Sequence, residues 1–79
     1  SLGLLNSPFV NRQSAFFAER LRQEAGEDTG EQIDRAFAIA FARPPSPAER
    51  ERLAALANDH GLEQVCRVLF NSSEFAFLQ

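Results

Sequence analysis

The sequence contains no Trp, Tyr, Met or Lys, and it has one Cys and one His among 79 residues. A single Cys cannot form a disulfide within the chain. With so few His, Cys, Tyr and Lys side chains, acid–base and covalent catalysis have few candidates. The absence of Trp and Tyr also removes two of the residues that dominate tight protein interfaces. The sequence therefore offers no catalytic residue, and an enzyme is a minor hypothesis.

Charge and hydropathy exclude further classes of function. The net charge is −3 and all eight basic residues are Arg, whereas a nucleic-acid-binding surface needs excess positive charge to neutralise phosphates. No apolar run approaches the roughly 20 residues that cross a bilayer. Five acidic residues lie between positions 24 and 34, but their spacing does not match a calcium-binding loop. We therefore predict that the chain binds no nucleic acid, metal or cofactor and does not insert into a membrane.

What the chain has in abundance is Phe, at eight residues, within a hydrophobic content of 44% that suffices for one small core. Hydrophobic periodicity, caps and breakers predict helices over 8–25, 30–42, 47–59 and 62–70, followed by a short helical turn. Ser7 caps the first helix with Pro8 at its first position, and Gly26 ends it. We predict an all-α fold, one compact domain over residues 1–79. It is a bundle of four main helices plus the C-terminal turn, with the second helix at its centre.

The faces of the helices give more specific expectations. On the first helix, one sector collects the large apolar side chains that we expect to face the core: Phe9, Val10, Phe16, Phe17 and Leu21. Gln13 and Arg20 lie in or beside this sector, and Arg20 can pair with Glu24 one turn later. The second helix has no polar residue between positions 36 and 42, so we expect neighbours to cover every side of it. The inward residues of the fourth helix are Leu62, Val65, Cys66, Val68, Leu69 and Phe70, which makes the Cys a small core hydrophobe.

Two junctions use the same device, an Asn that ends an apolar run and a Ser that opens the next turn. They are Asn6-Ser7 near the start of the chain and Asn71-Ser72 near its end. Asn tolerates the left-handed conformation that ends many helices. A Ser hydroxyl accepts hydrogen bonds from the free N–H groups of the helix that follows. We expect the Phe after each Ser to turn inward.

The connector after the second helix contains a candidate structural site at Arg43. Pro44 disfavours helix at the preceding residue, and Ser46 with Glu49 forms a capping box for the third helix. Arg43 follows the last turn of a helix, where a cation can bind exposed carbonyls, and Glu49 or Glu74 can supply a carboxylate. We therefore predict that Arg43 acts as a structural clamp rather than as part of a ligand site.

The last turn is a candidate contact surface. Phe75, Phe77 and Leu78 place three large apolar side chains within four residues. Phe75 and Leu78 can point one way from a short helical turn, and Phe77 then points elsewhere. We therefore expect one of these groups to stay partly exposed, as at many contact surfaces. The alternative is that both phenylalanines pack into the core of the domain itself.

Three segments of the chain together resemble the C-terminal part of the planctomycete surface domain family, a domain of unknown function. The family reads approximately L-L-N-S-P-F-V, then L-G-R-x-P-[ST]-x-x-E, then L-L-N-S-x-E-F. The corresponding segments here are Leu5-Asn6-Ser7-Pro8-Phe9-Val10, Phe41-Ala42-Arg43-Pro44-Pro45-Ser46-Pro47-Ala48-Glu49 and Leu69-Phe70-Asn71-Ser72-Ser73-Glu74-Phe75. The resemblance spans residues 4 to 77. Where the family commonly has Leu-Gly before the Arg, this chain has Phe41-Ala42, which we expect to tighten the turn less.

The resemblance implies a place rather than an activity. It implies the C-terminal end of a large exported multidomain protein, outside the cytoplasm or on the cell surface, often with cytochrome-c-like domains upstream. The sequence itself has no C-x-x-C-H haem attachment site. We expect a non-catalytic structural or protein-interaction module whose partners are other domains of the same protein or another protein. The alternatives are a helix-turn-helix-like nucleic-acid binder, because Gly61 makes a tight turn between two helices, and a part of an uncharacterised enzyme.

Overall fold

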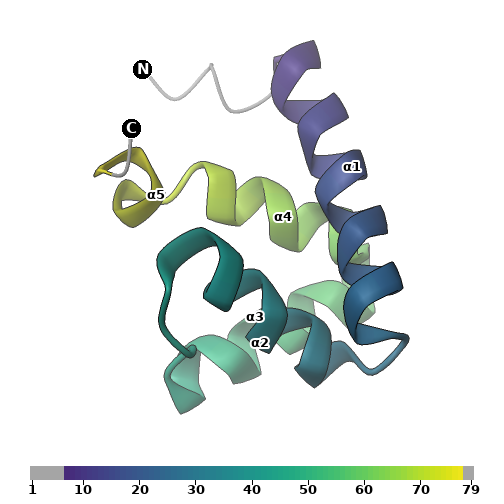
Figure 1. Ribbon diagram of the computed structural model, residues 1–79, viewed down its shortest axis with the longest axis vertical. Coiled ribbons are helices and arrows are strands. Elements are labelled where there is room, and N and C mark those ends of the chain that lie inside the picture. The colour runs from purple at the N-terminus through teal and green to yellow at the C-terminus, as the bar shows by residue number, and fades with distance from the viewer. Residues whose placement is uncertain (1–6, 78–79) are drawn as a thin grey trace.

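The structure, a computed structural model, describes residues 7–77, with side chains through residue 75. It contains five helices and, within the described residues, no strand: α1 (Pro8–Ala25), α2 (Thr29–Phe41), α3 (Pro47–His60), α4 (Leu62–Phe70) and α5 (Ser73–Phe77) (Figure 1). The predicted all-α architecture of four main helices and a short final one is confirmed. Each predicted boundary lies within about one residue of the observed one, because local capping signals set most of these ends.

The helix starts follow from side-chain caps. The Ser7 hydroxyl accepts from the Val10 N–H at 3.1 Å, with Pro8 at the first helical position. For α3, the Ser46 hydroxyl accepts from the Glu49 N–H at 3.1 Å, and the Glu49 carboxylate accepts from the Ser46 N–H at 2.8 Å. The predicted capping box is therefore present with both of its hydrogen bonds.

The second helix begins and ends differently from the others. At its start, the Asp28 carboxylate accepts from the Glu31 N–H at 3.0 Å and caps the helix. The buried Gln32 side chain donates to the carbonyl of Gly26 at 2.6 Å and ties the connector to α2. At its end, Ala42 adopts the left-handed conformation with φ 57° and ψ 33°. The turn is therefore as tight as one built on Gly, but a residue with a Cβ is strained there.

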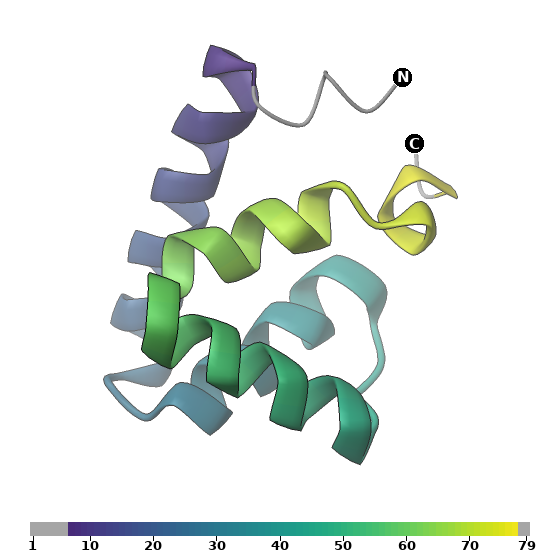
Figure 2. The ribbon, with the colours of Figure 1, turned by 180° about the vertical axis from the view of Figure 1, so that it is seen from behind.

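The helices pack around α4 and α2. The most extensive helix–helix contact joins α1 to α4, and both α2 and α4 also contact α3 and α5. Figures 1 and 2 show α4 lying between α1 and α3, with α5 at the end of α4 that is distant from α1. The core consists of Ala18, Leu21, Ile33, Ala36, Phe37, Leu62, Val65, Cys66 and Leu69. The radius of gyration is 11.7 Å, close to the roughly 11.6 Å expected for a compact chain of this length.

The expected inward face of α1 is confirmed at Leu21, which is fully buried, and at Phe17, which packs against the core, but it is wrong at Phe9 and Phe16. The side of α1 that meets the core carries Ser14, Ala18 and Leu21, all fully buried, whereas Phe9 is 62% exposed and Phe16 is 66% exposed. The recurrence of small residues four apart lets α4 come close to α1. This close approach selects the small-residue face, so Phe9 and Phe16, at the far edge of the predicted sector, are left outside.

Two further burial expectations are corrected. Ala38 is exposed, so neighbours do not cover every side of α2. On α4, Val68 is 47% exposed rather than inward, whereas Cys66 is fully buried as predicted.

The residue that ends α4, Asn71, has φ −98° and does not adopt the expected left-handed conformation. Its side chain instead donates to the carbonyl of Arg67 at 2.9 Å, which satisfies one of the free carbonyls at the helix end.

Candidate functional site

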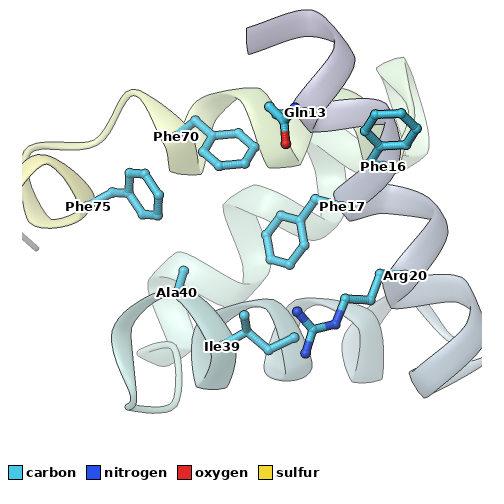
Figure 3. Close-up of a pocket in the computed structure, with 8 residues that line it drawn as sticks. All are labelled: Gln13, Phe16, Phe17, Arg20, Ile39, Ala40, Phe70 and Phe75. Carbon is cyan, nitrogen blue, oxygen red and sulfur yellow. The ribbon is translucent and has the colours of Figure 1, made fainter. Parts of the chain in front are cut away.

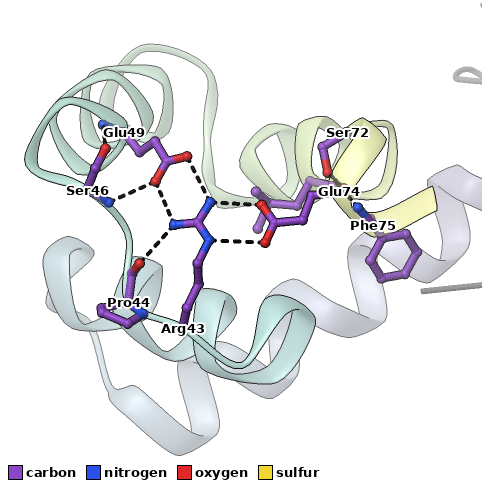
Figure 4. A network of polar contacts seen from close by, with 8 residues as sticks. Arg43, Pro44, Ser46, Glu49, Ser72, Glu74 and Phe75 are labelled. Carbon is purple, nitrogen blue, oxygen red and sulfur yellow. Dashed lines mark hydrogen bonds and ion pairs between the residues drawn. The ribbon is translucent and has the colours of Figure 1, made fainter. Parts of the chain in front are cut away.

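Arg43 lies where the end of α2, the start of α3 and α5 meet (Figure 4). Its Nε and Nη2 donate to the two oxygens of Glu74 at 3.0 and 2.8 Å. Its Nη1 and Nη2 donate to the two oxygens of Glu49, both at 3.0 Å, and Nη1 also donates to the carbonyl of Pro44 at 2.9 Å. Both carboxylates that the sequence offered as partners therefore bind the guanidinium at once.

These bonds use all five N–H donors of the Arg43 guanidinium. The guanidinium carbon also lies 5.2 Å from the centre of the Phe37 ring and 5.8 Å from that of Phe41. The hydrogen bonds from Arg43, followed by the one from the Ser46 N–H, lower the pKa of Glu49 to about 2. The cluster leaves no donor of Arg43 open to a ligand.

The other motif residues of the two junctions have local roles. The Ser72 hydroxyl donates to the carbonyl of Leu69 at 2.9 Å and accepts from the Phe75 N–H at 3.2 Å, so it caps α5. Asn6 and Leu78 lie outside the described residues, as does the side chain of Phe77. The structure describes one member of the expected contact surface, Phe75, and this residue is half-buried.

An aromatic groove opens between α1, α2, α4 and α5, with a volume of about 440 Å³. It is lined by Gln13, Phe16, Phe17, Arg20, Ile39, Ala40, Phe70 and Phe75 (Figure 3). Phe17 and Phe70 have ring centres 5.8 Å apart, and Phe70 meets Phe75 edge to face at 5.1 Å. Figure 3 shows these three rings turned toward a common space, with Phe16 at the rim.

The polar groups of the groove come from α1. Arg20 donates through Nε to Glu24 at 2.8 Å, which is the predicted pair, and Arg35 donates to the other oxygen of Glu24 at 2.8 Å. These two hydrogen bonds, that from Arg20 first, lower the pKa of Glu24. The Gln13 side chain has no hydrogen-bond partner among the described residues. The groove thus combines an aromatic floor with an amide and a guanidinium on one wall.

The groove was not predicted from the sequence, because Phe9 and Phe16 were expected to lie in the core. A signal was present: the polar residues Gln13 and Arg20 interrupt the same sector of α1. A sector that alternates large apolar and polar side chains is typical of a surface that is only partly covered.

Among the side chains of residues 7–75, the other chemistry-bearing groups are not gathered into a site. Burial raises the pKa of the Cys66 thiol to about 12, consistent with a core side chain. Within residues 7–75, no cluster of three or more His, Cys, Asp or Glu side chains is placed to hold a metal ion. In the described part of the chain, no helix has both the length and the apolar character needed to cross a membrane.

Comparison with known protein families matches residues 1–57 to the model of PSD1, described as a protein of unknown function (DUF1553). The matched stretch includes the first two of the three segments on which the resemblance rests, and the third segment follows it. No curated protein and no solved structure matches the chain.

Proposed function

The chain belongs to the PSD1 family, proteins of unknown function (DUF1553), and we propose that its role is docking rather than catalysis. In this proposal the chain is a non-catalytic helical module of a larger exported or cell-surface protein. It binds another domain of that protein, or a second protein, through α1 and the aromatic groove beside it. The extracytoplasmic location rests on the resemblance of the three sequence segments.

The observation that carries the proposal is the exposure of Phe9 and Phe16 beside an aromatic groove. Their side chains are 62% and 66% exposed, although the chain contains enough apolar surface to build a core without them. Burying a Phe side chain stabilises a protein by roughly 1.5–3 kcal/mol. Large apolar side chains left exposed beside a groove are typical of an interaction surface.

The alternatives draw no comparable support. As a recognition helix, α4 would have to present polar and basic side chains to DNA. It instead exposes Glu63 and Val68 and buries four apolar residues against its neighbours. For an enzyme, the single His and the single Cys would be the first candidates for catalysis. His60 is exposed on the surface, whereas Cys66 is buried and its pKa is raised.

Photo-cross-linking tests the docking proposal directly. A benzoylphenylalanine replaces Phe16 in the protein as it is made in its native cells, and a matched variant carries it at Ala55, which is exposed on α3. We expect position 16 to cross-link to one other polypeptide segment, identified by mass spectrometry, and position 55 to yield none. Equal cross-linking at the two positions, or none at position 16, would contradict docking through α1.

The proposed location has its own test. A membrane-impermeant protease is expected to digest a tag attached to the module in intact cells, or in cells whose outer envelope is permeabilised while the cytoplasmic membrane stays sealed. Digestion only after the cytoplasmic membrane is broken would place the module in the cytoplasm and remove that part of the proposal.

A further inference from the structure

The exposed side of α1 carries a stripe with the spacing of a helix–helix seam. Phe9, Gln13, Phe16 and Arg20 follow one another at intervals of four, three and four residues. At about 100° per residue they lie within about 60° of each other on the helix surface. Alternating three- and four-residue steps are the pattern by which one α-helix packs lengthwise on another. The stripe therefore suits an occupant that is itself a helix running along α1.

The length of the stripe sets the length of the occupant. Phe9 and Arg20 are eleven residues apart, or about 16 Å along the axis at 1.5 Å per residue. A matching helix needs about three turns. Its apolar side chains would lie against Phe9 and Phe16 and reach into the groove between Phe17 and Phe75.

The charge of this side is opposite to that of the chain as a whole. Arg20 and Arg35 share the single carboxylate of Glu24, which leaves one positive charge in excess at the Arg20 end of the stripe. Arg12, also exposed on α1, has no partner among the described residues. The chain nevertheless has a net charge of −3. The Nη groups of Arg20 make no hydrogen bond within the described residues, so they are available to a carboxylate from outside.

We infer that the occupant of this surface is an acidic amphipathic α-helix. It presents apolar side chains to Phe9 and Phe16 and an Asp or Glu to Arg20. A polar pair at Gln13 fixes the register, as single polar positions do in helix–helix seams. This inference rests on the proposed docking function and names the chemistry of the partner.

A display library of amphipathic helices four turns long tests the inference, with charged positions randomised and selection on the 79-residue chain. We expect enriched peptides to carry apolar residues at steps of three and four and an acidic residue at the position opposite Arg20. Phe16→Ser is expected to weaken their binding roughly tenfold or more, as loss of one buried aromatic contact does. The matched control, Val68→Ser on α4, should leave binding unchanged.

Charge reversal separates the inference from the proposed function. Selection on Arg20→Glu should enrich Lys or Arg at the position that was acidic, and circular dichroism shows whether the variant is folded. Helices that depend on Phe16 but show no charge preference on either protein would overturn the acidic partner and leave docking intact. A library that yields no Phe16-dependent helix would overturn the helical occupant as well.

Two other possible occupants of this surface can be told apart from a helical partner by experiment. A concentration-dependent dimer in analytical ultracentrifugation that Phe16→Ser abolishes would assign the surface to a second copy of the chain. Peptide affinity that rises by tenfold or more when residues 1–6 are removed would assign it to that segment. Either result overturns the inference.

Discussion

The Arg43 corner and the exposed side of α1 are both built from arginine and phenylalanine, yet they are completed to different degrees. All five donors of Arg43 are bound within the chain, and its guanidinium lies over Phe37 and Phe41. Arg20 uses one donor, beside the 66% exposed Phe16. The same residue types therefore serve internal structure where every group finds a partner. Where groups are left over, as on the exposed side of α1, the proposed docking function gives them a partner outside the chain.

The largest expected contrast is between two phenylalanines. Phe37→Ala should lower the free energy of unfolding by about 3–5 kcal/mol, because Phe37 is 2% exposed and its removal leaves a cavity. Phe16→Ala should change it by less than about 0.5 kcal/mol, as is usual for surface positions. Urea denaturation of both variants measures the contrast. Similar losses would mean that Phe16 belongs to the core and that the two regions do not differ.

The core beneath both regions can be tested through Cys66. Because burial raises the pKa of Cys66 from 9.0 to about 12, its thiol stays protonated in the folded state while it ionises in the unfolded one. The difference between the two pKa values therefore affects the free energy of unfolding. The buried, protonated thiol makes its full contribution to stability below pH 9, and this contribution is lost as the pH rises toward 12. The slope should approach about 1.4 kcal/mol per pH unit.

The composition isolates this effect, because the chain has no Lys and no Tyr to titrate in the same range. Denaturation between pH 8 and pH 11 should therefore show the loss in the wild type and a much flatter profile in Cys66→Ala. An unchanged slope in the variant would assign the alkaline loss to another cause.

A smaller effect distinguishes the two arginines. Arg43→Lys should lower the free energy of unfolding by a small but measurable amount, since a point charge cannot reproduce two forked carboxylate contacts that are themselves partly exposed. Arg20→Lys should cost little, because it loses one exposed pair within α1. Chemical denaturation of the two variants gives the comparison, and coincident midpoints would remove the clamp.

Stability at low pH gives a second test of the Arg43 cluster. The pKa of Glu49 is lowered to about 2 from 4.5, so its contribution to stability is present above pH 4.5 and is lost as the pH falls toward 2. Arg43→Lys should therefore shrink the loss of stability over this range. A wild-type acid profile in the variant would show that Glu49 owes its low pKa to another group.

The smallest expected effect is a gain. Ala42 is the residue with a positive φ at the end of α2, where the left-handed conformation costs a residue with a Cβ about 1 kcal/mol. Ala42→Gly should raise the free energy of unfolding by roughly 0.5 kcal/mol, after the greater unfolded-state entropy of Gly is subtracted. A lower melting temperature in the variant would contradict the strain.

Local chemistry explains what was predictable. The caps at Ser7 and Ser46 and the stops at Gly26 and Gly61 depend on residues within one turn, so the sequence alone could define the helices. The face that α1 turns inward depends on how closely α4 approaches it, which hydrophobicity by itself does not encode. Ser14 and Ala18 were decisive there and were passed over because small residues contribute little to an apolar sector.

The candidate site shows the same division. Glu49 lies six residues from Arg43, close enough in the chain for the two side chains to meet across a single turn. Its pairing with Arg43 was therefore predictable from local spacing. Glu74 lies 31 residues away, so its binding at the same time as Glu49 depends on where α5 is placed. The groove draws its lining from four helices, and no single window of sequence contains it.

The brevity of α5 gives the groove an adjustable end. A five-residue helix (Ser73–Phe77) has no stability of its own. Its side chains hold it to the rest of the fold through the ion pair of Glu74 with Arg43 and the ring contact of Phe75 with Phe70. It should therefore open as a separate cooperative unit at a free-energy cost below that of global unfolding, and its amides should exchange hydrogen before those of α4. Under the proposed docking function, a partner longer than the groove would gain room by displacing Phe75 while the rest of the bundle stays folded. Partners of different lengths would then fit the same four-helix frame.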